Sequence, residues 1–394
     1  MIIQRLFLFT FLLSFLIPAL AQDYTVSVTT VAVWVKATDK EGNPETGLVS
    51  GDFSVLEDNR PMPISCFEER NLDASQNGEK LLQKRKLILA IDLYNTSHTE
   101  FFAVRDALAN FVDQLDPETW DVMVAAILAS APTEAVPFTN EFEQIHNELQ
   151  SLKGNTFRDQ EIAKRKREIV EMLKSGRIAG GKARAYELAQ FYAQDEQQIA
   201  EQTLRGLVGL GKYLSNAEEH VVIVFVSGGI NTRPGLQYRQ LLEKADTKRD
   251  FDADMSAFRN PSFMEKIQKQ LSVLLQKNVT IYGLNTRGTF NPGTDHVRDE
   301  SSTYSVTDRS MLSYYQEGMD EVAALSGGLS FKNLNDFERP LATILADTTS
   351  QYIICYKPEH QDDKEKYRKI EVKTNKSGIT LRHRKGYWTT GTER

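Results

Sequence analysis

The sequence has few cysteines and no region of extreme composition. Its 394 residues include 2 cysteines, 12 prolines and 23 glycines. Two cysteines are too few for a four-cysteine zinc site or a disulfide-dense scaffold. The modest proline and glycine content excludes a collagen-like or broadly disordered chain. With 41% hydrophobic and 26% charged residues, the composition is that of a globular protein, and the length corresponds to about two domains.

Positive charge and catalytic motifs are also scarce. The chain has 47 Lys and Arg against 54 Asp and Glu, a net charge of −7. A general nucleic-acid binder needs a basic face to neutralise phosphates, so this balance argues against a nucleic-acid partner. The sequence contains no HExxH, GxSxG or CxxC motif, and its 6 histidines are scattered without ligand-like spacing.

The only long apolar run lies at the N-terminus and indicates a signal peptide at residues 1–21. Arg5 precedes an apolar run to Ile17, and the segment ends in the small-x-small sequence Ala-Leu-Ala. The alternative is a membrane anchor, but the run is short against the roughly 20 residues that cross a bilayer, and Pro18 interrupts it. We therefore expect cleavage near Ala21, a secreted or periplasmic protein, and no stable membrane span afterwards.

Two β-rich segments flank the centre of the chain. Residues 22–70 and 349–394 show short apolar–polar alternation interrupted by Gly, Pro and Asn, which is typical of antiparallel strands. Residues 71–84 are polar and indicate a linker. Each β segment is too small to bury a core alone, so we expect the two to pack together as one small sandwich-like module.

Residues 85–348 predict an α/β domain with an open, mostly parallel sheet and helices on both faces. The apolar runs KLILAID, DVMVAAILA, VVIVFVSGG and NVTIYGLN are typical of strands buried on both faces, and helical stretches separate them. Residues 158–213 interrupt this alternation with a long charged helical insertion. We interpret its charged runs as solvated faces, and the sequence assigns the insertion no role.

Export changes the interpretation of Cys66 and Cys355. In an oxidising compartment the two can form a disulfide, and both lie in strand-like sequence. The alternative is two buried free thiols that pack as small hydrophobic residues. The sequence does not fix their separation in space, so both interpretations stay open.

The best candidate for a binding site follows the first buried strand, which ends at Asp92. Ligands of open α/β sheets bind beyond the carboxyl ends of the strands. A carboxylate followed by hydroxyl side chains such as Thr96 offers hard oxygen ligands suited to Mg²⁺ or Ca²⁺. The structural alternative is that Asn95 or Ser97 caps the next helix.

At these residues the sequence resembles a von Willebrand factor type A domain. The similarity covers the strand ending at Asp92, the loop LKGNT at 152–156, and the runs VVIVFVSGG and NVTIYGLNT. The flanking sequences are more specific. VWVKATDKEGNPETGLVSGDFSVLEDNRPMPISCFEE, ADTTSQYIICYKP and KYRKIEVKTNKSGITLRHRKGYW look like parts of the VWFA-related family typical of acidobacteria. The resemblance implies a type A domain inserted in a β module, in an exported protein.

The resemblance also implies a degenerate metal site. Type A domains bind Mg²⁺ through a D-x-S-x-S motif, a Thr on a second loop and an Asp on a third. Asp92, Thr96 and Thr156 match ligand positions, whereas Tyr94 and Gly228 stand where a Ser and an Asp are expected. We therefore expect at most weak Mg²⁺ binding and no other cofactor. The alternative is that the Asp92 carboxylate only braces the loops.

We expect a non-enzymatic, adhesion-type module that presents its strand-end loops to a protein partner. The alternative is a hydrolase or other enzyme with an unrecognised site. Catalysis needs a nucleophile and a base that converge in one pocket, and the sequence shows no such pair, so no catalytic residue is assigned. Neither the identity of the partner nor the oligomeric state follows from the sequence.

Overall fold

The computed structural model describes residues 30–71, 84–128, 132–154, 158–174, 181–214, 220–245, 263–287, 308–359 and 366–389. The expected signal peptide, its cleavage site at Ala21 and nearly all of the expected linker lie outside these residues. None of the described helices is both long and apolar enough to cross a membrane.

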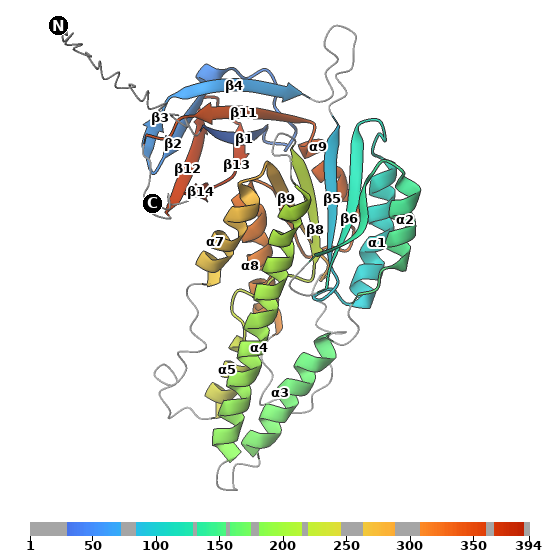
Figure 1. Ribbon diagram of the computed structural model, residues 1–394. Helices are drawn as coiled ribbons and strands as arrows, with labels where there is room; N and C mark the ends of the chain where they lie inside the picture. Colours follow the sequence, from blue (N-terminus) through green and yellow to red (C-terminus); the bar gives the residue numbers. More distant parts are fainter. Residues whose placement is uncertain are drawn as a thin grey trace, which may run out of the picture.

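A six-stranded sheet forms the centre of the molecule, with strand order β10-β9-β8-β5-β6-β7 (Figure 1). All neighbouring strands are parallel except β6 and β7. This arrangement confirms the expected α/β class with a mostly parallel sheet. The strands are β5 (Arg85–Asp92), β6 (Trp120–Ile127), β7 (Pro132–Thr139), β8 (Val221–Ser227), β9 (Val279–Asn285) and β10 (Ser330–Phe331).

Helices cover both faces of this sheet because its central strands are apolar on both sides. In β5, Leu89 and Ile91 pack toward one face, while Ile88 and Ala90 pack toward the other. The first face is covered by α1 (His98–Asp113), α2 (Phe142–Ser151) and α9 (Glu338–Asp347). The second is covered by α4 (Gly181–Gly209), α7 (Phe263–Leu275) and α8 (Asp308–Ser326).

The apolar runs of the sequence predict neither β7 nor the two-residue strand β10 of this sheet. Strand β7 lacks such a run because of its prolines. It carries Pro132 and Pro137, residues that lack the backbone donor needed inside a ladder. The strand lies at the edge of the sheet, antiparallel to β6 and with irregular register, so its outer donors need no partner strand. Because its prolines interrupt the apolar pattern, a prediction based on apolar runs does not find this strand.

The two ends of the chain form two further antiparallel sheets above the central one (Figure 1). Their orders are β13-β1-β11-β4 and β14-β12-β2-β3, so each sheet contains strands from both ends. A shared core includes Val33, Val55, Ile354 and Ile370. We call these sheets the β module. Its strands are β1 (Val31–Thr38), β2 (Phe53–Glu57), β3 (Arg60–Met62), β4 (Ile64–Asn71), β11 (Ser350–Tyr356), β12 (Tyr367–Thr374), β13 (Thr380–His383) and β14 (Gly386–Trp388), and η1 (Ser50–Asp52) precedes β2.

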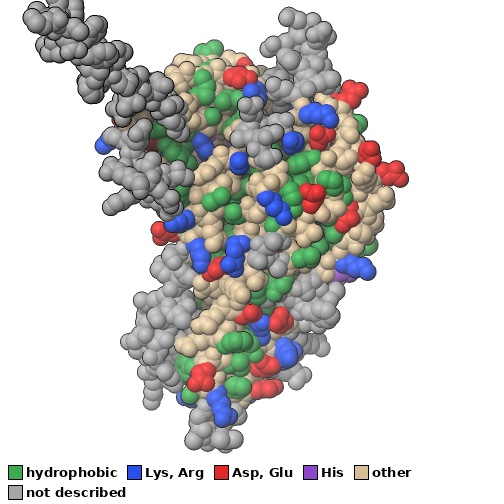
Figure 2. All heavy atoms as spheres, viewed as in Figure 1, with side chains coloured by type: hydrophobic (Ala, Val, Ile, Leu, Met, Phe, Trp, Pro, Cys, Tyr) green, Lys and Arg blue, Asp and Glu red, His purple; other side chains and the backbone are tan. Residues whose placement is uncertain are grey.

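The helical insertion extends away from the sheet as an arm (Figure 1). The helical arm consists of α3 (Arg158–Lys174), α4 and α5 (Leu236–Ala245), and η2 (Leu210–Tyr213) leads from α4 back to the sheet. Its own small core includes Ile169, Tyr186 and Tyr238. Acidic and basic side chains are interspersed over the visible face of the arm (Figure 2).

The expectation of a fully solvated charged face is wrong at Arg165. This side chain is only 9% exposed. Its guanidinium lies 2.7 Å from the Asp195 carboxylate and 3.5 Å from that of Glu196, and it stacks over the ring of Tyr192. The charge is buried because α3 packs along α4, where acidic side chains compensate it.

A buried cluster of charged groups joins the β module to the central sheet. Asp347, at the end of α9, accepts from Lys36 of β1 at 3.1 Å and from Arg382 of β13 at 3.1 Å. Tyr282 of β9 donates to the same carboxylate. Burial opposes ionisation of Asp347, but the two cations outweigh it, so its pKa lies below the usual value. Burial lowers the pKa of Lys36 despite the attraction of Asp347.

Arg384 makes a second connection between the same two parts. Its guanidinium donates to the carbonyl of Ala32 in β1 at 2.8 Å and to that of Leu275 at 3.3 Å. Leu275 is the last residue of α7, so the cation lies at the negative end of a helix dipole. The contact with Leu275 holds the β module on the helix that precedes β9, and the contact with Ala32 fixes the Arg384 side chain on β1.

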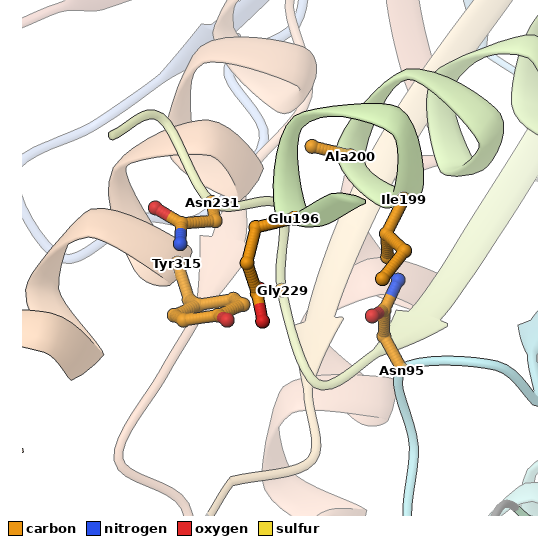
Figure 3. Close-up of a pocket in the computed structure, with 7 residues that line it drawn as sticks. All are labelled: Asn95, Glu196, Ile199, Ala200, Gly229, Asn231 and Tyr315. Carbon is orange, nitrogen blue, oxygen red and sulfur yellow. The ribbon is translucent and has the colours of Figure 1, made fainter. Parts of the chain in front are cut away.

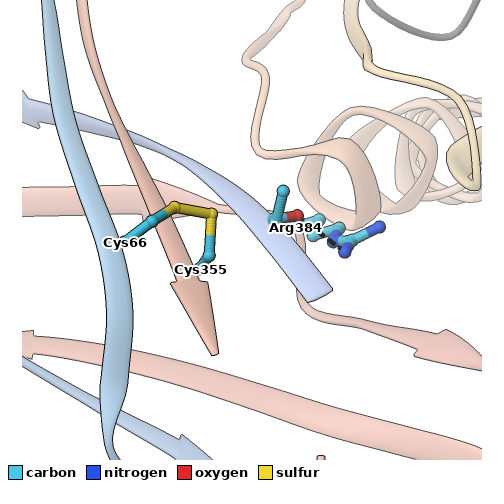
Figure 4. The surroundings of a disulfide bond; sticks show 4 residues. Cys66, Cys355 and Arg384 are labelled. Atoms are coloured by element: carbon cyan, nitrogen blue, oxygen red, sulfur yellow. Dashed lines mark hydrogen bonds between the residues drawn. A yellow bond between two sulfur atoms is a disulfide. The ribbon is translucent and has the colours of Figure 1, made fainter. Parts of the chain in front are cut away.

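Cys66 and Cys355 form a disulfide between β4 and β11 (Figure 4). The two residues are directly opposite in the antiparallel ladder, and their Cα atoms are 4.8 Å apart. Of the two interpretations that the sequence leaves open, the structure contains the bonded one. The bond links segments that are 289 residues apart, so it holds the two ends of the chain together in the β module.

Replacing Asp347 by Asn is expected to destabilise the protein strongly, because the buried Lys36 and the partly buried Arg382 then lose their counter-charge. Removing one partner of a buried ion pair costs about 3–5 kcal/mol. Denaturant unfolding measures this loss against Lys36→Met, which removes a charge and replaces it with an apolar side chain and should cost less.

A carboxyl group whose pKa is lowered in the folded state stabilises the fold at pH values above its unfolded-state pKa, and this stabilisation is lost as the pH falls. The difference between wild type and Asp347→Asn should therefore be constant above about pH 4 and shrink below it. A difference that grows on acidification would contradict the ion pairing.

Replacing both cysteines by serine is expected to lower stability by up to about 5 kcal/mol, because the disulfide closes a very long loop in the unfolded chain. Thermal unfolding of the oxidised wild type and of Cys66→Ser/Cys355→Ser measures the effect. Adding a reductant should destabilise only the wild type. Equal melting temperatures for the oxidised and reduced wild type would rule out a stabilising bond.

Candidate functional site

A polar row crosses the central sheet where three neighbouring parallel strands end. Asp92, Ser227 and Asn285 are the last residues of β5, β8 and β9. Ser227 pairs with Asn285, and Ile91 pairs with Val226, so Asp92 comes next to Ser227. All three side chains are fully buried. The candidate site is therefore a polar layer beneath the loops at the carboxyl edge of the sheet.

Four donors hold the Asp92 carboxylate. The backbone amides of Tyr94 and Asn95 donate to Oδ1 at 3.2 and 3.1 Å. The Asn95 side-chain amide and the Ser227 hydroxyl donate to Oδ2 at 3.0 and 2.8 Å. An ionised carboxylate has about four lone-pair positions, so these contacts use its accepting capacity fully. Burial raises the pKa of Asp92, while the hydrogen bonds from Ser227 and Asn95 act in the opposite direction.

Two glycines allow the neighbouring loops to approach Asp92 and its loop closely. A Cβ on Gly154 would lie 2.6 Å from the Thr96 carbonyl oxygen and 2.5 Å from that of Ser97. A Cβ on Gly228 would overlap the carbonyl oxygen of Asn95. The loops after β5, α2 and β8 therefore touch through their backbones, at distances that only glycine permits.

The same network reaches the helical arm. The Asn95 side-chain amide also donates to the Thr203 hydroxyl of α4 at 2.6 Å. Asn95 therefore connects Asp92 to a helix of the arm, and the Ser227 hydroxyl accepts from the Gly229 amide at 3.0 Å. Ser97, not Asn95, caps α1, through reciprocal hydrogen bonds with Glu100.

A small cavity lies beside Asn95, between the loop after β8 and the helices α4 and α8 (Figure 3). Its empty volume of about 180 Å³ includes space open to solvent. Pockets that bury a small-molecule ligand are usually at least about 300 Å³, so this cavity is too small for an ordinary substrate. It is lined by Asn95, Glu196, Ile199, Ala200, Gly229, Asn231 and Tyr315.

The described residues at this edge do not fit a divalent ion. Asp92 has no accepting position left, and Gly228 touches the Asn95 carbonyl where the resemblance predicts a carboxylate. Three buried oxygens at this edge have no hydrogen-bond partner among the described residues, and none of them belongs to a carboxylate: the hydroxyls of Thr96 and Thr286 and the side-chain oxygen of Asn285. Tyr94 contributes its backbone amide to Asp92, and Thr156 lies outside the described residues. No described group of three or more His, Cys, Asp or Glu side chains is placed to hold a metal. These contacts favour the alternative in which Asp92 braces the loops.

Two members of the network lacked a sequence signal. Ser227 is visible as a polar residue at the end of the run VVIVFVSGG, but nothing marked it as a partner of Asp92. Thr203 lies 108 residues from Asn95, inside a helix with no motif. Hydrogen bonds between side chains so far apart in sequence follow only from the packing of α4 on the sheet.

Comparisons with known proteins assign no family. No family model matches the chain, and no curated protein matches its sequence. Among solved structures, it is similar to the conserved hypothetical protein BatB from Bacteroides thetaiotaomicron, with 12% identity and a TM-score of 0.33, over 67% of this chain and 96% of that one. It is also similar to the three N-terminal domains of the type V pili tip protein Mfa5 from Porphyromonas gingivalis, with 8% identity and a TM-score of 0.33, over 82% of this chain and 56% of that one. Such low scores assign neither a shared fold nor a function.

Replacing Gly228 by Ala is expected to destabilise the protein by roughly 1–3 kcal/mol or more, because the new methyl group overlaps the Asn95 carbonyl. Gly51→Ala is the matched control, since a Cβ there meets no atom within 4 Å. Denaturant unfolding of both variants measures the difference. If the two variants were equally stable, the loops after β5 and β8 would not be packed as described. An Asp side chain at position 228 would meet the same Asn95 carbonyl, so Gly228→Asp should not create a metal site.

Proposed function

We propose that this chain is an exported protein-binding module of the von Willebrand factor A type, which presents the loops at the carboxyl edge of its central sheet to a protein partner. The strand-end loops are residues 93–97, 152–154, 228–235 and 286–287. Leu128, directly after β6, adds an exposed apolar side chain at the same edge. The proposal includes no resident metal and no catalytic step.

The observation that carries this proposal is the fixed geometry of the strand-end loops around Asp92. Hydrogen bonds from Tyr94, Asn95 and Ser227 hold the loops after β5 and β8 in one arrangement. A surface that is ordered before binding loses less conformational entropy when a partner docks. Loops on a rigid scaffold are also the usual place for binding residues in α/β folds.

The chemistry of this edge favours binding over catalysis. The carboxylate at its centre is fully buried and has no accepting position left. The adjoining cavity, of about 180 Å³, is too small to enclose a typical substrate. Neither feature offers a substrate contact to a nucleophile or a base.

Two further features support export and the type A assignment. The disulfide of the β module is stable in an oxidising compartment, which agrees with the signal-peptide pattern at residues 1–21. The mostly parallel sheet with helices on both faces, and the buried Asp92 at the end of β5, are features that the resemblance implies.

Blocking the strand-end surface tests the proposal. Immobilised wild-type protein should capture a protein from the cell envelope of its source organism, identified by mass spectrometry. Leu128→Trp adds bulk at the carboxyl edge and should reduce this capture by about tenfold or more, a change of about 1.4 kcal/mol. Val273→Trp is the matched control because it alters an equally exposed aliphatic residue of α7, at 59% against 54% for Leu128.

The same assay checks the role of metal. Capture should persist in a chelator, since no part of the described site depends on a divalent ion. Equal capture by the Leu128→Trp and Val273→Trp variants would refute binding through this edge. Loss of capture in the chelator, with recovery on adding Mg²⁺, would show that an ion completes the site.

A further inference from the structure

The disulfide of the β module lies at the edge of its sheet. Strand β4 is the last strand in the order β13-β1-β11-β4, so one side of Cys66 has no neighbouring strand among the described residues. Cys66 is exposed, whereas Cys355, on the inner strand β11, is only partly exposed. A thiolate that approaches the folded protein from solvent therefore reaches the sulfur of Cys66 more readily than that of Cys355.

The ladder between β4 and β11 is irregular directly beside this bond. Cys355 pairs with Cys66, but the next residue of β11, Tyr356, pairs with Ile64, so Ser65 lies outside the regular pairing. Such an extra residue disrupts the ladder locally. The backbone on this side of Cys66 is therefore less constrained, which allows its sulfur to move when the bond is exchanged.

Contacts on the other side of Cys66 hold β4 independently of the bond. Residues 67–71 pair regularly with residues 350–354 of β11. The centre of the Phe67 ring lies 5.6 Å from that of Phe53 and 5.7 Å from that of Tyr352. These contacts should keep β4 on β11 after reduction, so that the two sulfurs remain close enough to form the bond again.

The nearest described arginine lies on the Cys355 side of the bond. Ala32, Cys355 and Cys66 are opposite one another in a row across β1, β11 and β4. The Arg384 guanidinium donates to the Ala32 carbonyl at 2.8 Å, one strand away from Cys355 and two strands away from Cys66 (Figure 4). A nearby cation stabilises a thiolate, and a more stable thiolate leaves faster, so Cys355 is the better leaving group.

The carboxylates that follow Cys66 on β4 already have partners. Glu68 is paired with Arg70 at 2.8 Å, and Glu69 accepts from the Gly47 amide at 2.8 Å. Salt also screens exposed charges of this kind. Their repulsion of an incoming thiolate is therefore small.

We propose that Cys66–Cys355 is a thiol–disulfide exchange site of the folded protein, attacked at Cys66 by a protein that carries a reactive dithiol. One thiolate of the dithiol forms a bond to Cys66 Sγ, and the electron pair of the broken bond leaves on Cys355 Sγ, which takes up a proton. The second thiolate of the dithiol then attacks its own mixed-disulfide sulfur and releases Cys66 as a thiol. The dithiol is thereby oxidised to a disulfide, while Cys66 and Cys355 are reduced.

Reduced glutathione identifies the sulfur that is attacked, because a monothiol first forms a mixed disulfide. The oxidised mature chain is treated with glutathione, free thiols are blocked at early times with iodoacetamide, and peptides are mapped by mass spectrometry. Glutathione should be on Cys66 and the blocking group on Cys355, in about tenfold excess over the opposite arrangement. An equal mixture, or the opposite arrangement, would overturn attack at Cys66.

Two single-cysteine variants form a matched pair for the same question. Cys355→Ser leaves the exposed Cys66 as a free thiol, and Cys66→Ser leaves the partly exposed Cys355. The Cys66 thiol should react several-fold faster with an aromatic disulfide reagent. Equal rates would show that exposure does not distinguish the two sulfurs in the folded protein.

The rate of reduction by dithiothreitol tests whether exchange needs unfolding. Gly228→Ala destabilises the strand-end loops, which are separate from the β module. Exchange in the folded state predicts rates for the wild type and this variant that agree within about twofold, whereas reduction through global unfolding follows the unfolded population. A rate that rises by the same factor as that population, measured by denaturant unfolding, would overturn the proposal. Low urea concentrations give the same comparison in the wild type alone.

The reduced wild type should keep its circular dichroism spectrum and recover the disulfide on reoxidation. Loss of the spectrum on reduction would overturn exchange in the folded state. Because this site is separate from the strand-end loops, its failure would leave the proposed binding function untouched.

Discussion

A buried carboxylate needs a hydrogen-bond or ion-pair partner for each of its oxygens. This requirement determines how the loops and the β module pack at the two ends of the strands of the central sheet. At the carboxyl edge, neutral donors from Tyr94, Asn95 and Ser227 satisfy Asp92. At the opposite edge, Lys36 and Arg382 satisfy Asp347. The two carboxylates differ in the direction of their pKa shifts. Burial raises the pKa of Asp92, whereas the neighbouring cations lower the pKa of Asp347 despite its burial. The first fixes the strand-end loops, and the second fixes the β module on the sheet.

The sequence was sufficient for features that depend on local pattern. Continuous apolar runs predicted β5, β6, β8 and β9, because a strand buried on both faces has no polar alternation. The same reasoning failed for β7, whose prolines are compatible only with an edge strand. The charged pattern around Arg165 also misled, since opposite charges on α3 and α4 can be solvated or can pair across two helices. Which of these occurs depends on how the helices pack, and a short stretch of sequence does not show that.

The candidate site divides in the same way. The position of Asp92 at a strand end was predictable, because strand ends are visible in the sequence and parallel strands share an edge. The partners of this carboxylate were not, since Ser227 and Asn95 approach it from separate loops and Thr203 from a distant helix. Gly228 is the clearest case of a residue whose role a motif alone does not predict. The resemblance identifies it as a missing ligand, whereas in the structure it is a contact that allows one loop to lie against another.

The Asp92 carboxylate lies at the centre of the carboxyl edge but presents no negative charge to a partner, because it is fully buried and its donors surround it. Positive charge in the described loops of this edge includes Arg233 and Arg287, whose guanidinium groups lie over the rings of Tyr314 and Tyr315. A guanidinium needs no ion from solution and cannot be deprotonated in proteins, so its charge persists at any physiological pH and metal concentration. Because the strand-end loops are already fixed through Asp92, little ordering is needed when a partner docks. The hydrogen bonds to Asp92 therefore contribute to the proposed binding indirectly, by lowering the conformational entropy that docking costs.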